Sequence, residues 1–115
     1  MMKAEHLQAL EKLPQSVTCR RIAFDHAQVV PGFVKDTYFL IVSGKKPWVS
    51  MRVELVPLIY VDRPDYWGIE VVGCQSGMGL PVEVPYTVHL EVTQVLGKSG
   101  IEVLGAARSE KIKVP

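Results

Sequence analysis

From Val17 onward, apolar and polar side chains alternate with a period of two, and this alternation is the strongest constraint on the fold. Valine, isoleucine, threonine and aromatic residues gather in short runs that Gly, Pro and Asp interrupt. Such runs are typical of half-buried β-strands. They predict strands at 16–24, 37–43, 48–61, 66–75, 85–96 and 101–109, with a further short strand near 27–30.

The first 13 residues follow a different pattern. Ala4, Leu7 and Leu10 recur at helical spacing and Pro14 follows them, which predicts a short α-helix over 1–13. No apolar stretch approaches the roughly 20 residues that cross a bilayer, and the N-terminus lacks the apolar segment of a signal peptide. We therefore expect a cytoplasmic protein in which Cys19 and Cys74 are reduced.

Length and charge narrow the class of protein further. A chain of 115 residues fits one domain. Its 13 basic and 12 acidic side chains give a net charge of +1, which argues against nucleic-acid and membrane-surface partners. We expect a single all-β domain over 1–115, with 16–109 as an antiparallel meander. It would form a β-sandwich or partly open β-barrel of about six to seven strands, with the helix over one face or end.

Residues 44–47 predict a tight turn between two of these strands. Pairing 37–43 with 48–55 across this turn would place Leu40 beside Met51 on a wholly apolar face. The opposite face of this hairpin is only half polar.

A second hairpin is predicted around 97–100, between 85–96 and 101–109. Small residues such as Gly105 on its inner face leave room for a bulky neighbour, which we expect to be Trp67. The outer face of this hairpin is again too apolar for a surface that meets only water.

In the run 48–61, the alternating apolar residues stand at odd-numbered positions up to Leu55 and at even-numbered positions from Val56 onward. This change predicts a β-bulge that bends a long strand. Pro57 supports the prediction, because proline within sheets is confined to edges and bulges.

The half-apolar outer faces need a cover, because soluble monomers rarely expose apolar patches beyond a few hundred Å². The N-terminal helix can cover one face. A second copy of the chain would cover the other, so we expect a homo-oligomer, with a dimer favoured. Alternatively, loops 25–36 and 76–84 cover it. The expected interface residues are Phe39, Ile41, Trp48, Val95 and Leu104.

The loops offer one candidate ligand site. In the meander, 44–47 and 76–84 lie at one end of the domain, and 62–65 and 97–100 lie at the other. Five residues at the first end could bind a small anionic or peptide ligand: Lys45, Lys46, Gln75, Ser76 and Met78. The glycine-rich stretch 73–81 is not a phosphate loop, because a strand follows it where the phosphate loop requires a helix.

Catalysis would depend on two weaker constellations. Cys74 could act as a nucleophile if His89 held it as a thiolate. Acid and base catalysis could come from Asp62, Asp65 and Glu70. The residue types at 62–65 are, however, also common in ordinary turns. The cysteines and histidines lack metal-ligand spacing, so we expect no metal and no cofactor.

These observations favour a non-enzymatic binding or assembly module with a ligand or protein partner. One alternative is a small enzyme that uses Cys74 with His89, or the three acids. The other is an accessory subunit that docks on a different protein through an apolar outer face.

Overall fold

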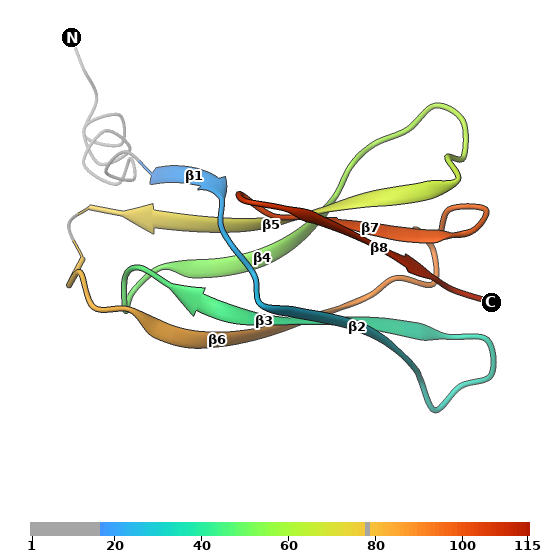
Figure 1. The fold of residues 1–115 in the computed structure, drawn as a ribbon, viewed down its shortest axis with the longest axis horizontal. Coiled ribbons are helices and arrows are strands. Elements are labelled where there is room, and N and C mark those ends of the chain that lie inside the picture. The colour runs from blue at the N-terminus through green and yellow to red at the C-terminus, as the bar shows by residue number, and fades with distance from the viewer. Residues whose placement is uncertain (1–16, 78) are drawn as a thin grey trace, which may run out of the picture.

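In a computed structural model that describes residues 17–77 and 79–115, the chain forms eight strands in two sheets (Figure 1). The all-β class expected from the sequence is confirmed, and the strands number eight where six or seven were expected. The described residues contain no helix. The helix expected over 1–13 lies outside them.

One sheet has five strands and the other has three. The five-stranded sheet consists of β1 (Val17–Arg21), β4 (Arg52–Pro57), β5 (Tyr66–Ser76), β7 (Gly100–Leu104) and β8 (Ser109–Lys113). The three-stranded sheet consists of β2 (His26–Pro31), β3 (Tyr38–Lys46) and β6 (Val84–Glu91). β5 is central: it pairs antiparallel with β4 and β1 and parallel with β7, while β3 lies between β2 and β6.

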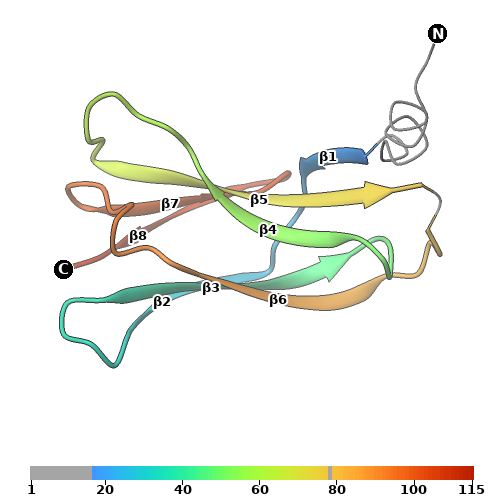
Figure 2. The same cartoon turned by 180° about the vertical axis from the view of Figure 1, so that it is seen from behind.

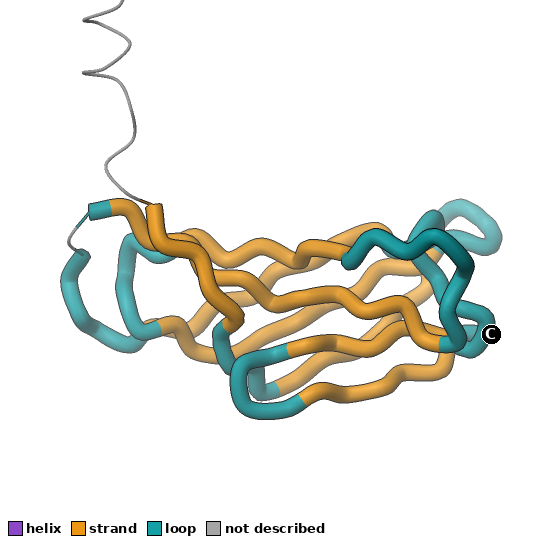
Figure 3. Tube along the Cα trace, turned by 90° about the horizontal axis from the view of Figure 1, so that it is seen from above, coloured by secondary structure: helices purple, strands orange, loops and turns teal. Residues whose placement is uncertain are grey.

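The two sheets form separate layers, and the hydrophobic core lies between them (Figures 1 and 2). Strand alternation turns one side of each sheet inward. Seven side chains are fully buried there: Leu40, Val42, Ile69, Val71, Val92, Ile101 and Val103. Figure 3 shows most strands following the long axis, with loops at the two ends and shorter loop segments between them. This is a sandwich-like arrangement.

The first expected hairpin is wrong. β3 pairs with β2 and β6, whereas β4 belongs to the other sheet and pairs with β5. Leu40 and Met51 are both buried in the core, so the apolar face itself was identified correctly. Two strands that face each other across a sandwich show the same alternation as two strands side by side, and this ambiguity is the source of the error.

The second expected hairpin and the meander are also wrong. β6 lies in the three-stranded sheet, whereas β7 pairs in parallel with β5 and antiparallel with β8. Gly105 is covered by Phe24 and not by Trp67, because a Cβ at Gly105 would lie 2.6 Å from the Phe24 ring. The indole nitrogen of Trp67 instead donates to the Leu58 carbonyl at 2.8 Å.

The bulge expected at Leu55 and Val56 is absent, because the β4–β5 register runs without interruption to Pro57. The strand ends there. Leu58 and Tyr60 then turn to the outer face of β5, where each would lie 2.9 Å from a Cβ built on Gly68. The parity change in the sequence therefore marks a strand end.

The expected placement of the loops at the two ends is confirmed. Val49 N donates to Leu80 O at 3.4 Å at one end, and Lys98 N donates to Pro64 O at 2.8 Å at the other. The expected strand near 27–30 also exists, as β2.

Candidate functional site

An apolar groove lies on the outer face of the three-stranded sheet, at the end where β2 turns into β3. Its volume is about 350 Å³. It is lined by Val30, Pro31, Gly32, Phe33, Phe39, Ile41 and His89. Of these seven residues, only His89 has a polar side chain.

The β-strand period forces these side chains outward. Leu40 and Val42 are fully buried on the inner face of β3, so their neighbours Phe39 and Ile41 face outward. Val30 is the β2 partner of Phe39, and His89 is the β6 partner of Ile41. The groove is therefore built by cross-strand neighbours of the three strands.

The β2–β3 loop gives the groove its rim. Gly32 N donates to Thr37 O at 2.8 Å, and Thr37 N donates to Val34 O at 3.2 Å. Asp36 adopts the left-handed conformation with a φ of 62°, which an acidic side chain tolerates in a tight turn. These contacts fix a compact loop from which Phe33 projects fully exposed.

The groove adjoins an unprotected sheet edge. β2 is an outermost strand and contains no Asp, Glu, Lys or Arg. Each of the other seven strands described has at least one of these residues. Natural edge strands usually carry charges, lysine above all, that prevent pairing with another chain. β2 carries none.

Phe39 and Ile41 are the expected interface residues that this groove contains. The other three lie elsewhere: Trp48 and Val95 pack against the core, and Leu104 lies beside Gly68 on the outer face of the five-stranded sheet. The five residues therefore do not form one surface. Alternation alone could not assign each strand to its sheet, so the predicted interface combined residues that belong to different surfaces.

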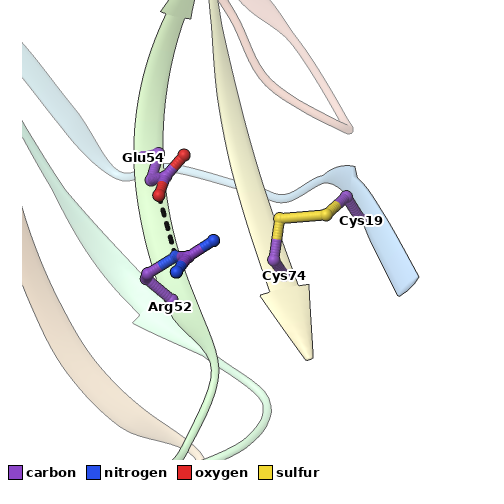
Figure 4. The surroundings of a disulfide bond; sticks show 4 residues. All are labelled: Cys19, Arg52, Glu54 and Cys74. Atoms are coloured by element: carbon purple, nitrogen blue, oxygen red, sulfur yellow. Dashed lines mark ion pairs between the residues drawn. A yellow bond between two sulfur atoms is a disulfide. The ribbon is translucent and has the colours of Figure 1, made fainter. Parts of the chain in front are cut away.

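Cys19 and Cys74 are cross-strand partners in the β1–β5 ladder and form a disulfide, with their Cα atoms 4.1 Å apart (Figure 4). The ion pair between Arg52 and Glu54 on β4 lies nearby, at 2.8 Å. The bond corrects the expectation of reduced cysteines. A separation of 55 residues along the chain gives no local signal of this pairing.

The disulfide also leaves Cys74 without a thiol, which removes the proposed nucleophile. Gly73 faces the core, since its Cβ would lie 2.8 Å from Ile22, so Cys74 faces outward on the five-stranded sheet. His89 faces outward on the opposite sheet, beside Ile41. The two side chains therefore cannot act together.

The three acids do not converge either. Glu70 accepts a hydrogen bond from Arg21 Nε at 2.8 Å on the outer face of β5. Asp62 and Asp65 lie exposed in the β4–β5 loop. Across residues 17–77 and 79–115, no three His, Cys, Asp or Glu side chains are placed to hold a metal ion.

The structure describes four of the five expected ligand residues, at the opposite end of the molecule. Lys46 donates to the Met51 carbonyl at 2.8 Å, and Gln75 donates to Ser50 Oγ at 2.9 Å. Lys45 lines a cavity of about 250 Å³ that also contains Arg20, Arg21 and Glu83. Ser76 ends β5, and Met78 lies outside the described residues.

Comparison with known proteins adds no relative: no family model, no curated protein and no solved structure matches this chain. In the part of the chain that the structure describes, no helix is long and apolar enough to cross a membrane.

Sequence reasoning named Phe39 and Ile41 but missed Val30 and Phe33. The expected strand near 27–30 has no charged residue, but neither has the run 37–43, so this feature did not single out β2. Its short length hid its role as a sheet edge.

Proposed function

We propose that this domain is a non-enzymatic binding or assembly module whose working surface is the apolar groove on the β2–β3–β6 sheet. The observation that carries the proposal is a groove of about 350 Å³ with an exposed phenylalanine, Phe33, at its rim. A concave apolar site with few polar groups is the usual form of a binding site. Soluble proteins rarely leave such a surface without a partner.

The lining defines the ligand class. Two aromatic rings and two branched aliphatic side chains favour an apolar group, such as a hydrophobic side chain of a protein or peptide. Burying such a side chain contributes about 1.5–3 kcal/mol. His89 is the one side chain placed to accept or donate a hydrogen bond at the wall.

The cysteine pair supports a different compartment from the one expected. Disulfides persist in oxidising compartments and are rare in the cytosol. We therefore place the working protein in an oxidising compartment and not in the cytoplasm.

A second candidate function is an accessory subunit that docks through the β4–β5 loop. Ile59 and Val61 in this loop are 98% and 102% exposed. The β4–β5 loop extends from the opposite sheet at the same end of the molecule as the β2–β3 loop (Figures 1 and 2).

Titration with Nile red, an uncharged apolar dye, tests the proposed function. We expect the wild-type chain to bind the dye saturably, and Ile41→Gln to weaken binding at least fivefold because a polar amide replaces the groove floor. Val56→Gln is the matched control, since Val56 is partly exposed on the outer face of the other sheet. It should leave the affinity within twofold of wild type.

The same titration separates the two candidates. A loss of dye binding in Ile59→Gln, with none in Ile41→Gln, would assign the working surface to the β4–β5 loop. Absence of saturable binding in the wild-type chain would contradict both.

A further inference from the structure

We infer that a second copy of this chain binds beside the groove, with its β2 strand pairing antiparallel with β2 along the open edge. The inference rests on the proposed function, because it names the partner that stands beside the same groove. It goes further in stating which backbone atoms join the copies and which residues meet.

The hydrogen bonds of the β2–β3 hairpin show which backbone groups of β2 are free. Gly32 N donates to Thr37 O, and this pair continues the β2–β3 register. Hydrogen-bonded pairs alternate along an antiparallel ladder, so Gln28 and Val30 also point their N–H and C=O toward β3. Ala27 and Val29 therefore point theirs to the open edge.

Both ends of this free edge are closed. Arg108 donates from Nη2 to the Asp25 carbonyl at 2.9 Å, which occupies the backbone just before β2. Pro31 ends the strand, and proline has no N–H to donate. The available edge is therefore short, and its only free donors are the N–H groups of Ala27 and Val29.

A two-fold axis through Gln28 satisfies all of these donors. It sets Ala27 opposite Val29 of the partner subunit and Val29 opposite the partner's Ala27, so four reciprocal N–H···O=C bonds form. It brings no like charges together, because the strand contains no Asp, Glu, Lys or Arg. A two-fold interface brings the same surface of both copies together, so β2 must pair with a second β2. Its sequence allows this pairing.

The pairing changes the binding site. In this register the outer-face row of Ile41 and Gln28 continues into the partner's Gln28 and the partner's Ile41. The two grooves then lie on one face of a continuous six-stranded sheet, one on each side of the axis, with the polar Gln28 pair between them. Such a site fits a ligand that carries an apolar group for each groove and a polar group between the two.

The two-fold register sets up a cross-linking test. Gln28 lies at a non-hydrogen-bonded position on the axis, where opposed Cα atoms are about 4.5 Å apart, within the range of a disulfide. Cys19 and Cys74 are bonded to each other, and the described residues contain no free cysteine. We expect Gln28→Cys to form a covalent dimer under mild oxidation.

The matched control is His26→Cys, on the same face of β2. It should stay monomeric on a non-reducing gel, because its Cα lies about 13 Å from its copy in this register.

Sedimentation velocity supplies the second measurement. At roughly 100 μM, well above a micromolar Kd, the wild-type chain should sediment as a dimer. Gln28→Lys opposes two cations on the axis and should weaken the dimer at least tenfold, whereas Thr87→Lys, on β6, should not.

A wild-type monomer at this concentration would overturn the inference, and so would a dimer that neither Gln28 variant affects. A monomer that still binds Nile red in an Ile41-dependent way would remove the second copy and keep the proposed function. In that case the edge is left for an extended segment of a different protein.

Discussion

Tyr86 is the residue whose chemistry the fold changes most clearly. Its hydroxyl donates a hydrogen bond to the Ala23 carbonyl at 2.8 Å, which ties β6 to the segment that follows β1. Burial, with a smaller contribution from the nearby Asp25 carboxylate, raises the pKa of Tyr86 from 10.0 to about 12. Both causes disfavour the phenolate.

This raised pKa makes stability depend on alkaline pH. The folded state holds the proton more tightly than the unfolded state, so the contribution is complete below pH 10 and is lost as pH rises to about 12. Two pKa units correspond to a loss of about 2–3 kcal/mol.

Tyr86→Phe should lower the free energy of unfolding by about 1–3 kcal/mol at neutral pH, because the Ala23 carbonyl loses its hydrogen-bond partner. It should also remove this component of the alkaline decline. Urea unfolding at pH 7 to 12 measures both effects, and parallel pH profiles for the two proteins would contradict the assignment.

At the residue scale, the sequence predicts which side chains are buried better than it predicts which residues contact each other. Leu40 and Met51 were placed on an apolar face, and both are buried. The disulfide and the Tyr86 hydrogen bond join residues 55 and 63 positions apart. Periodicity reports which way a side chain faces, and it carries no information on such long-range contacts.

Among the elements, β1 depends most on a single covalent bond. All five of its residues are exposed, and it pairs only with β5. The Cys19–Cys74 disulfide joins these two strands at the middle of their ladder. It also closes a long loop, which restricts the unfolded chain.

Replacing both cysteines by serine should therefore lower the free energy of unfolding by about 2–4 kcal/mol. Urea unfolding measures this change, and Thr18→Ser on the same strand is the control that should be nearly neutral. Thiol titration of the denatured wild-type chain should find no free thiol from these two residues. Two free thiols, or a double variant as stable as wild type, would contradict the bond's role.

At the element scale, alternation located most strands but not their partners. The runs that became β2, β3 and β5 were found near their observed bounds, whereas the run predicted at 85–96 ends as β6 at Glu91. β8 was missed, because Ile112 is its only large apolar residue. The parallel pairing of β5 with β7 also left no signal, since a parallel neighbour and an antiparallel one bury the same alternate residues.

At the scale of the whole molecule, the two sheets differ in what they leave exposed. On the outside of the five-stranded sheet, charged pairs such as Arg21 with Glu70 and Arg52 with Glu54 lie among apolar side chains. The three-stranded sheet carries the apolar groove and the charge-free edge of β2. The sequence predicted an apolar outer face that needs a cover, but not which sheet carries it.

The central claim is that the β2 edge is paired in the working protein, and amide hydrogen exchange at Ala27 and Val29 tests it most directly. These N–H groups point away from β3 and make no backbone hydrogen bond within the part of the chain that the structure describes. Residue-resolved exchange at a concentration that favours association should show both amides protected as strongly as those of β3. Exchange at the rate of unprotected amides would contradict the account and leave β2 an open edge.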